Sequence, residues 1–100
     1  MKERAVIFSP EARDDLAALY GWIAAAAHPQ TALDYIERIE IYCHGMSIGS
    51  ERGTRRDDIR PGLRIVTFER RVTIAFTVGA ARVTILRLFY AGRNWEDLPP

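Results

Sequence analysis

The chain has 100 residues and a mass of 11.4 kDa, a size that predicts one domain spanning residues 1–100. Its 48% hydrophobic and 27% charged residues are ordinary for a folded protein and exclude a disordered chain. Cys43 is the single cysteine, which excludes an intrachain disulfide and a cysteine-based zinc site, and no apolar run approaches the roughly 18 residues of a membrane-spanning helix.

The first predicted elements are a short strand and a helix. Residues 5–8 are apolar without a gap, which is typical of a strand buried on both faces. Ser9 and Pro10 then favour a helix start, with Ser9 as the N-cap and Pro10 at the first helical position. The helix should end near Ala27, because the residue before Pro29 avoids helical backbone angles.

A second helix is predicted to begin at Pro29 and to stop at Gly45, so that the two helices form an antiparallel hairpin. A loop rich in glycine and arginine follows over residues 47–62. The pattern then predicts three strands and a tail, over residues 63–68, 72–78, 83–90 and 91–100. The order β-α-α-β-β-β, with a helical hairpin packed on a small, mainly antiparallel sheet, defines an α+β fold.

The predicted core consists of large apolar residues on the inward faces of these elements. They are Ile7, Leu16, Leu19, Ile23, Ile36, Ile39, Ile74, Phe76, Ile85 and Leu86.

Charge is unevenly distributed along the chain. Residues 1–50 carry four basic and seven acidic side chains, whereas residues 51–100 carry ten basic and six acidic ones. Every basic residue in the second half is arginine. Arginine suits carboxylates, phosphates and aromatic faces. The second half therefore forms either an ordinary solvated surface with local ion pairs or a basic face that meets an acidic protein or a nucleic acid.

No catalytic constellation stands out in the sequence. It contains no phosphate-binding loop and no dinucleotide fingerprint, and His28 and His44 have too few companion ligands for a metal site. We therefore expect no metal and no cofactor. Two large aromatic residues suggest binding instead: Trp22 lies off the apolar stripe of the first helix, and Trp95 lies in the polar tail as a plug or an interface anchor.

Several short motifs, in order, resemble the RelE/ParE toxin superfamily of bacterial toxin–antitoxin modules, and its ParE branch in particular. They include SPEA at residues 9–12, WIA at 22–24, RPGLR at 60–64 and RLFYAGRNWE at 87–96. The last is similar to the family pattern R-x-L-H-G-A-R-D-W-E, but Tyr90 replaces the usual histidine and Ala-Gly replaces Gly-Ala.

The resemblance implies a toxin that inhibits DNA gyrase by binding and that a ParD-like antitoxin neutralises. Two alternatives stay open: a RelE-like endoribonuclease that cleaves mRNA on the ribosome, and a member that has lost toxicity and only binds its antitoxin. The ribonuclease alternative is weakened because the second strand has Arg64-Ile65-Val66 where two basic residues would alternate. A net charge of +1 also makes direct nucleic-acid binding by this chain alone unexpected.

Two sets of binding residues follow from these motifs and from the Arg-rich half. The candidates for contact with the target are Tyr90, Arg93, Trp95, Arg71 and Arg64. The candidates for contact with the antitoxin are Tyr20, Trp22, Arg55, Arg56 and Arg60. No catalytic residue is assigned, although the Tyr90 hydroxyl is the one group that a ribonuclease reading would use for proton transfer.

The expected location is the reducing cytoplasm, without membrane association. The N-terminal Met-Lys-Glu-Arg is highly charged and the apolar run after it is short, which does not fit a secretory signal.

Overall fold

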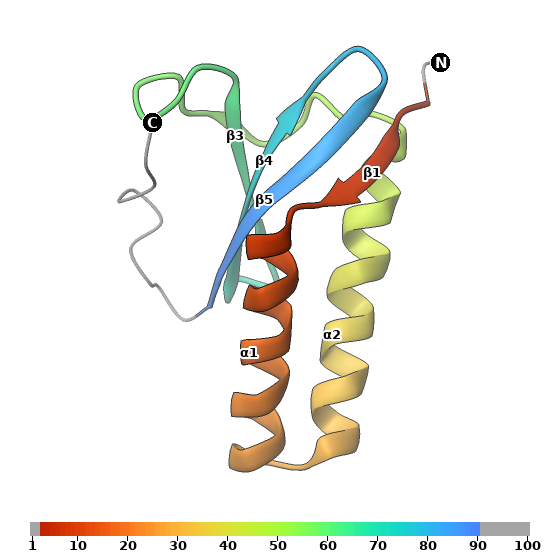
Figure 1. Ribbon diagram of the computed structural model, residues 1–100, viewed down its shortest axis with the longest axis vertical. Helices are drawn as coiled ribbons and strands as arrows, with labels where there is room; N and C mark the ends of the chain where they lie inside the picture. Colours follow the sequence, from red (N-terminus) through yellow and green to blue (C-terminus); the bar gives the residue numbers. More distant parts are fainter. Residues whose placement is uncertain (1–2, 91–100) are drawn as a thin grey trace.

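The computed structural model describes residues 3–90 and places two helices on one face of a five-stranded sheet (Figure 1). The helices are α1, Pro10–Ala26, and α2, Pro29–His44, which continues into a short 3-10 turn, η1, Gly45–Ser47. The strands are β1, Ala5–Phe8; β2, Thr54–Arg55; β3, Leu63–Phe68; β4, Val72–Val78; and β5, Arg82–Tyr90. The expected α+β fold is confirmed, and the two-residue β2 is an addition that the sequence pattern did not predict.

The sheet has the order β1-β5-β4-β3-β2. Strand β1 runs parallel to β5, and the other neighbouring strands are antiparallel. The C-terminal end of β5 therefore lies beside the start of β4, where Tyr90 is opposite Val72. This end of the sheet faces the helical hairpin, and it carries the candidate site.

Helix α1 begins as its cap predicts. The Ser9 Oγ accepts the Ala12 N–H at 3.0 Å and also donates to the carbonyl of Leu86 at 2.8 Å, so one side chain joins the helix start to β5. The helix ends at Ala26, close to the predicted boundary, because Pro29 disfavours helical angles just before it.

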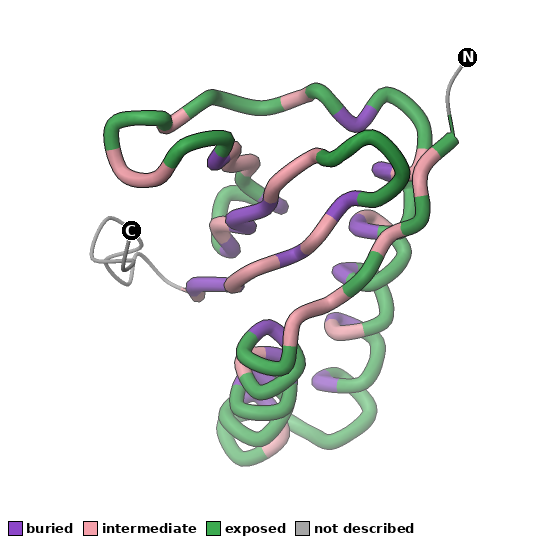
Figure 2. The backbone as a smooth tube through the Cα atoms, turned by 45° about the horizontal axis from the view of Figure 1, so that its top comes forward, coloured by how far each residue is buried: buried purple, intermediate pink, exposed green. Residues whose placement is uncertain are grey.

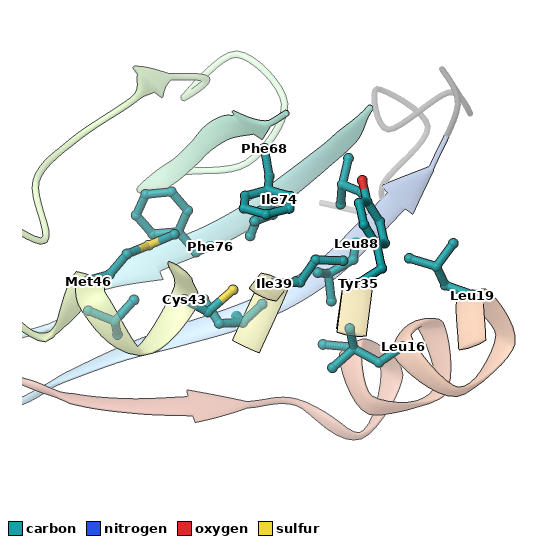
Figure 3. Packing of buried hydrophobic residues seen from close by; sticks show 14 of the residues in the cluster. Leu16, Leu19, Tyr35, Ile39, Cys43, Met46, Phe68, Ile74, Phe76 and Leu88 are labelled. Carbon is teal, nitrogen blue, oxygen red and sulfur yellow. The ribbon is translucent and has the colours of Figure 1, made fainter. Parts of the chain in front are cut away.

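The core lies between the hairpin and the sheet, where the buried residues gather in Figure 2 and interlock in Figure 3. The predicted core residues that the structure buries are Leu16, Leu19, Ile23, Ile39, Ile74, Phe76 and Ile85. Tyr35 and Cys43 of α2, with Met46 of η1, also pack in this core. Burial raises the pKa of the Cys43 thiol to about 12, so the thiol behaves as a small apolar group.

Strand β1 corrects one of our predictions. Ile7 is 37% exposed, and exposure alternates along the strand, so the prediction of a strand buried on both faces was wrong. The reason is that only one face of β1 meets the core: Phe8 packs against it, whereas Ile7 points to the opposite face, which meets solvent at this edge of the sheet. Ile36 of α2 is also only partly buried, packed against the margin of the core.

A bulge in β5 explains why Leu86 is only partly buried. Ala75 pairs with Arg87 while Phe76 pairs with Ile85, so Leu86 is an extra residue in β5. The alternation of inward and outward side chains therefore shifts by one residue in this strand, so that both Ile85 and Leu88 face the core. A single period of two residues, as assumed for the sequence, cannot describe such a strand.

The turn between β3 and β4 is tight and strained. Glu69 and Arg70 both have positive φ, 50° and 61°, and the Arg71 N–H donates to the Phe68 carbonyl at 3.0 Å. Such turns normally contain Asn-Gly, because side chains disfavour this left-handed region. Glu69 is held in place by Arg38 of α2, whose Nε and Nη2 donate to its carboxylate at 3.1 and 3.0 Å.

Replacing Arg70 with glycine should therefore stabilise the protein, by about 0.5–1 kcal/mol in the free energy of unfolding. Glycine removes the strain of the positive φ at this position. Urea denaturation measures the change, and Arg82→Gly, at an exposed strand position without positive φ, is the matched control that should destabilise. A loss of stability in Arg70→Gly would show that the turn is not strained.

Within residues 3–90, no helix has the length and hydrophobicity needed to cross a membrane. The same part of the chain holds no group of three or more histidine, cysteine, aspartate or glutamate side chains suited to a metal ion.

Candidate protein-binding site: the Trp22 groove

Two adjoining pockets open where the hairpin meets the end of β5, and they share Trp22 and Tyr90 as walls. We call them together the Trp22 groove. The first, the β5 pocket, has a volume of about 450 Å3 and is lined by Asp15, Ala18 and Leu88 among others. The second, the hairpin pocket, has a volume of about 670 Å3. Its further walls include Ile23, Tyr35, Arg38, Glu69 and Arg71.

Aromatic rings form the centre of the groove. The rings of Trp22 and Tyr90 are 5.1 Å apart between centroids and inclined by 54°, and those of Tyr35 and Tyr90 are 6.3 Å apart and nearly perpendicular. Trp22 is nevertheless 57% exposed, because it lies on the flank of α1 and not on its inward face. A large aromatic side chain that is held on one side and open on the other is typical of a protein-binding anchor.

The floor of the β5 pocket is fixed by an ion pair between α1 and β5. Arg87 Nε and Nη2 donate to the Asp15 carboxylate at 2.8 and 3.0 Å, and the Leu88 N–H donates to the same carboxylate at 2.9 Å. The Asp15 side chain is only 13% exposed, so these bonds are shielded from water. Asp15 thus satisfies a backbone donor of β5 just after the bulge, beyond the point where β1 ends.

The rim of the hairpin pocket is polar. Arg38 pairs with Glu69 and lies over the Tyr35 ring, 4.9 Å from its centroid. The hydrogen bond from Arg38 lowers the pKa of Glu69, whereas burial is the main cause that raises the pKa of Tyr35. Within residues 3–90, the Arg71 guanidinium has neither a hydrogen bond nor an ion pair.

This arrangement is suited to binding. Aromatic rings, aliphatic walls and an arginine are the side chains that protein interfaces use as anchors. Among residues 3–90, no histidine or carboxylate lies beside Tyr90 in the geometry of a general acid–base pair, since Glu69 is bound to Arg38 and Asp15 to Arg87.

The family of the chain follows from a comparison with known proteins. A model of the ParE toxin of the type II toxin–antitoxin system parDE matches residues 6–95. The chain belongs to the ParE toxin family. The proteins of this family are the toxin component of a toxin–antitoxin pair, so membership implies a cognate antitoxin as partner.

The fold of the family is also seen in a solved structure described as the chromosomal ParDE toxin–antitoxin system from P. aeruginosa. It superposes with a TM-score of 0.77 at 24% sequence identity, over 89% of this chain and 97% of that chain. At this identity the likeness establishes the shared fold. The chain matches no curated protein sequence.

The structure brings together residues from both predicted binding sets. Trp22, predicted for the antitoxin, contacts Tyr90, predicted for the target, and Arg71 lines the same pocket. Tyr20 is 38% exposed and lines neither pocket of the groove. Arg93 and Trp95 lie outside the described residues.

The remaining predicted arginines lie at the opposite end of the sheet. Arg64 of β3 pairs with Arg55 of β2 and with Phe76 of β4. Tyr90 pairs with Val72, which lies four residues before Phe76 in β4. Four strand residues span about 13 Å. Arg64 also donates to the carbonyl of Arg52 at 3.3 Å.

The loop arginines have acidic neighbours of their own. Arg55 contacts Asp57 at 3.1 Å, and Arg56 donates to both oxygens of Asp58 at 2.9 and 2.8 Å, a bond that lowers the pKa of that carboxyl. Asp57 in turn accepts the N–H of Gly62. These contacts close the loop on itself, and exposed pairs of this kind can be exchanged for a partner's carboxylates at little cost.

The sequence interpretation did not single out Tyr35, Glu69 or Asp15 for the site. Tyr35 lies on the apolar stripe of α2 and is indistinguishable there from an ordinary core residue. Its hydroxyl on an otherwise apolar face is the one signal that marks it. Asp15 and Glu69 are recognisable only when α1, α2, β4 and β5 are assembled.

Proposed function

We propose that this chain is a toxin that acts by binding DNA gyrase, and that its antitoxin neutralises it by occupying the Trp22 groove. The observation that carries the proposal is the exposed Trp22 packed against Tyr90 in a chain of the ParE family. Gyrase is the target that the family resemblance implies. The absence of an acid–base pair beside Tyr90, among residues 3–90, supports inhibition by contact over inhibition by chemistry.

The antitoxin contributes an amphipathic, acidic segment that becomes ordered on the groove. Its apolar side chains pack on Trp22 and Leu88, and its carboxylates face Arg71 and the other arginines of the second half. Such coupled folding buries a large area and loses ordering entropy, and it stabilises the partner that was already folded. Addition of the antitoxin should therefore raise the melting temperature of the toxin by mass action.

The target surface lies at the same end of the molecule, around Tyr90 and Arg71. Arg93 and Trp95, which lie outside the described residues, remain candidates for the same contact on the ground of their residue types. Trp and Arg are the residues most often found at binding hot spots. Replacing Trp95 or Arg93 with alanine should weaken gyrase inhibition about thirtyfold or more, because loss of a hot spot costs at least ~2 kcal/mol and ~1.4 kcal/mol is tenfold. The half-inhibitory concentration in a supercoiling assay measures this loss, and an unchanged value would remove both residues from the target surface.

A ribosome-dependent endoribonuclease is the second candidate, and one observation favours it. Tyr90 and Arg71 line the same pocket, which supplies a hydroxyl and a cation in one place. Against it stand the distance of Arg64 from this pocket and the bond from Arg64 to the Arg52 carbonyl. Tyr90→Phe separates the two functions: it should leave gyrase inhibition nearly unchanged, whereas a ribonuclease that uses this hydroxyl would lose activity by about 10²-fold or more.

The decisive experiment compares two reactions with the same purified toxin. One contains gyrase and relaxed plasmid, and the other contains ribosomes that are translating a defined mRNA. We expect inhibition of supercoiling and no cleavage of the mRNA. Codon-dependent cleavage without an effect on supercoiling would contradict the proposal and establish the second candidate. The cytoplasm, where gyrase and its DNA are found, is the location that the proposal requires.

A further inference from the structure

A buried hydroxyl in the hairpin pocket has no partner. The Tyr35 side chain is only 9% exposed, and its Oη forms no hydrogen bond within residues 3–90. Figure 3 shows the Tyr35 ring rising from α2 toward the sheet, with the hydroxyl at its far end. An unpaired buried hydroxyl is costly, and almost all such groups in folded proteins are paired. Among residues 3–90, the Tyr35 Oη is the one buried side-chain polar atom that lacks such a partner.

The charges around the Tyr35 hydroxyl indicate which chemical group could pair with it. Among residues 3–90, the charges of Glu69, Tyr90, Arg71 and Arg38 act on Tyr35. Arg38 and Glu69 neutralise each other through two hydrogen bonds. Among residues 3–90, Arg71 is then the cation of this pocket that has no ion pair. One hydroxyl donor and one guanidinium, with a balance of one positive charge, match a single carboxylate.

The walls of the pocket define the rest of the ligand. Trp22, Ile23 and Ala26 of α1 line one side, and the Tyr90 ring stands perpendicular to that of Tyr35. A carboxylate that enters between them must be attached to an apolar group that covers the rings. An acidic side chain on the apolar face of a peptide has this composition.

We propose that Tyr35 and Arg71 form a receptor for an aspartate or glutamate side chain of the antitoxin, and that the adjoining rings of Trp22 and Tyr90 take its apolar neighbour. The inference rests on the proposed docking of the antitoxin in the Trp22 groove, and it identifies the antitoxin side chain that is held there. The carboxylate accepts one hydrogen bond from Tyr35 Oη and one or two from the Arg71 guanidinium. Within residues 3–90, no carboxylate is bonded to Tyr35 Oη or to the Arg71 guanidinium.

The first test uses a matched pair of small probes, 4-phenylbutanoate and its uncharged amide, 4-phenylbutanamide. Chemical-shift changes of the labelled toxin should report binding of the acid with a dissociation constant of about a millimolar, weakened by salt, and binding of the amide at least about tenfold weaker. Equal binding of the two probes would overturn the inference. A hexameric RNA that binds more tightly than the acid would also overturn it, because the pocket would then belong to a nucleic acid.

The second test removes the hydroxyl alone. Tyr35→Phe should weaken binding of phenylbutanoate about tenfold and leave the urea midpoint of the free toxin equal or higher, since an unpaired buried hydroxyl is removed. Arg71→Gln should weaken the acid similarly and abolish its salt dependence. The controls are Tyr42→Phe, a partly buried tyrosine beside Phe68, and Arg82→Gln at the far end of β5.

Each outcome of the second test is informative. A marked loss of stability in Tyr35→Phe would show that the hydroxyl is already paired in the free toxin, and unchanged binding in both site variants would place the acid elsewhere; either result overturns the inference. Neither assay contains gyrase or antitoxin. A failure of the receptor therefore leaves the gyrase proposal standing, and a failure of gyrase inhibition leaves the receptor standing.

Discussion

Replacement of Trp22 with alanine should weaken binding of the cognate antitoxin at least about thirtyfold. Trp22 and Tyr90 are the walls that both pockets of the groove share, and the centroids of their rings are 5.1 Å apart. A partner that fills the groove buries the exposed 57% of this side chain. Removal of the indole therefore deletes the largest apolar contact at the centre of the interface. Titration calorimetry with purified antitoxin measures the change in affinity.

Ile41→Ala is the matched control for this variant. Ile41 is 65% exposed on α2 and lines neither pocket of the groove, so its truncation also removes an exposed apolar side chain but should leave the affinity within about twofold. Both variants should fold, since the deleted atoms are largely in contact with solvent. If Trp22→Ala binds as tightly as the unaltered toxin, the antitoxin docks on another surface.

Replacement of Phe76 with alanine should lower the free energy of unfolding by about 3–5 kcal/mol. Phe76 is fully buried at the centre of β4, between the hairpin and the neighbouring strands. A single domain has about 5–15 kcal/mol in total, so this variant approaches the limit of stability. Ile74→Ala, on the same face of the strand, should cost about 2–5 kcal/mol for the same reason.

Urea denaturation of the variants measures these losses, and Ile7→Ala serves as control. Ile7 is 37% exposed on the edge strand, so its truncation should cost less than about 1 kcal/mol. Losses below about half a kcal/mol in Phe76→Ala would mean that the side chains of β4 alternate in the opposite sense.

The features that local chemistry determines were predictable from the sequence. Ser9 and Pro10 set the start of α1 through a cap and a fixed φ, and these effects act within one helical turn. The alternation from Val72 to Val78 identified the inward face of β4, because one face is covered by helices. The order of the elements also followed from the periodicity and the turn residues along the chain.

The predictions of burial were wrong for Ile7 and Leu86, where the surroundings of the strand in the sheet determine which side chains face the core. An apolar run such as residues 5–8 fits a central strand or an edge strand equally well. It does not show that the face of β1 that carries Ile7 meets solvent. The bulge at Leu86 is likewise invisible in the sequence of β5, because it is defined by the residues of β4 that lie opposite.

The candidate site was predicted in its residue types and not in its grouping. Trp22, Tyr90 and Arg71 were each selected, but the sequence assigned them to two surfaces, because they lie in separate segments: α1, β5 and the turn between β3 and β4. Folding brings them to one end of the sheet and leaves Arg64 at the other. One groove used by both partners would let the antitoxin neutralise the toxin by covering its target surface.

Titration of the antitoxin into a gyrase supercoiling reaction that contains a fixed, inhibitory amount of the toxin tests this proposal most directly. We expect the toxin alone to stop supercoiling, and we expect full activity to return when the antitoxin reaches one molecule per toxin. Supercoiling that proceeds normally at toxin concentrations that arrest bacterial growth would contradict gyrase as the target. Inhibition that persists in the presence of excess bound antitoxin would contradict a shared groove.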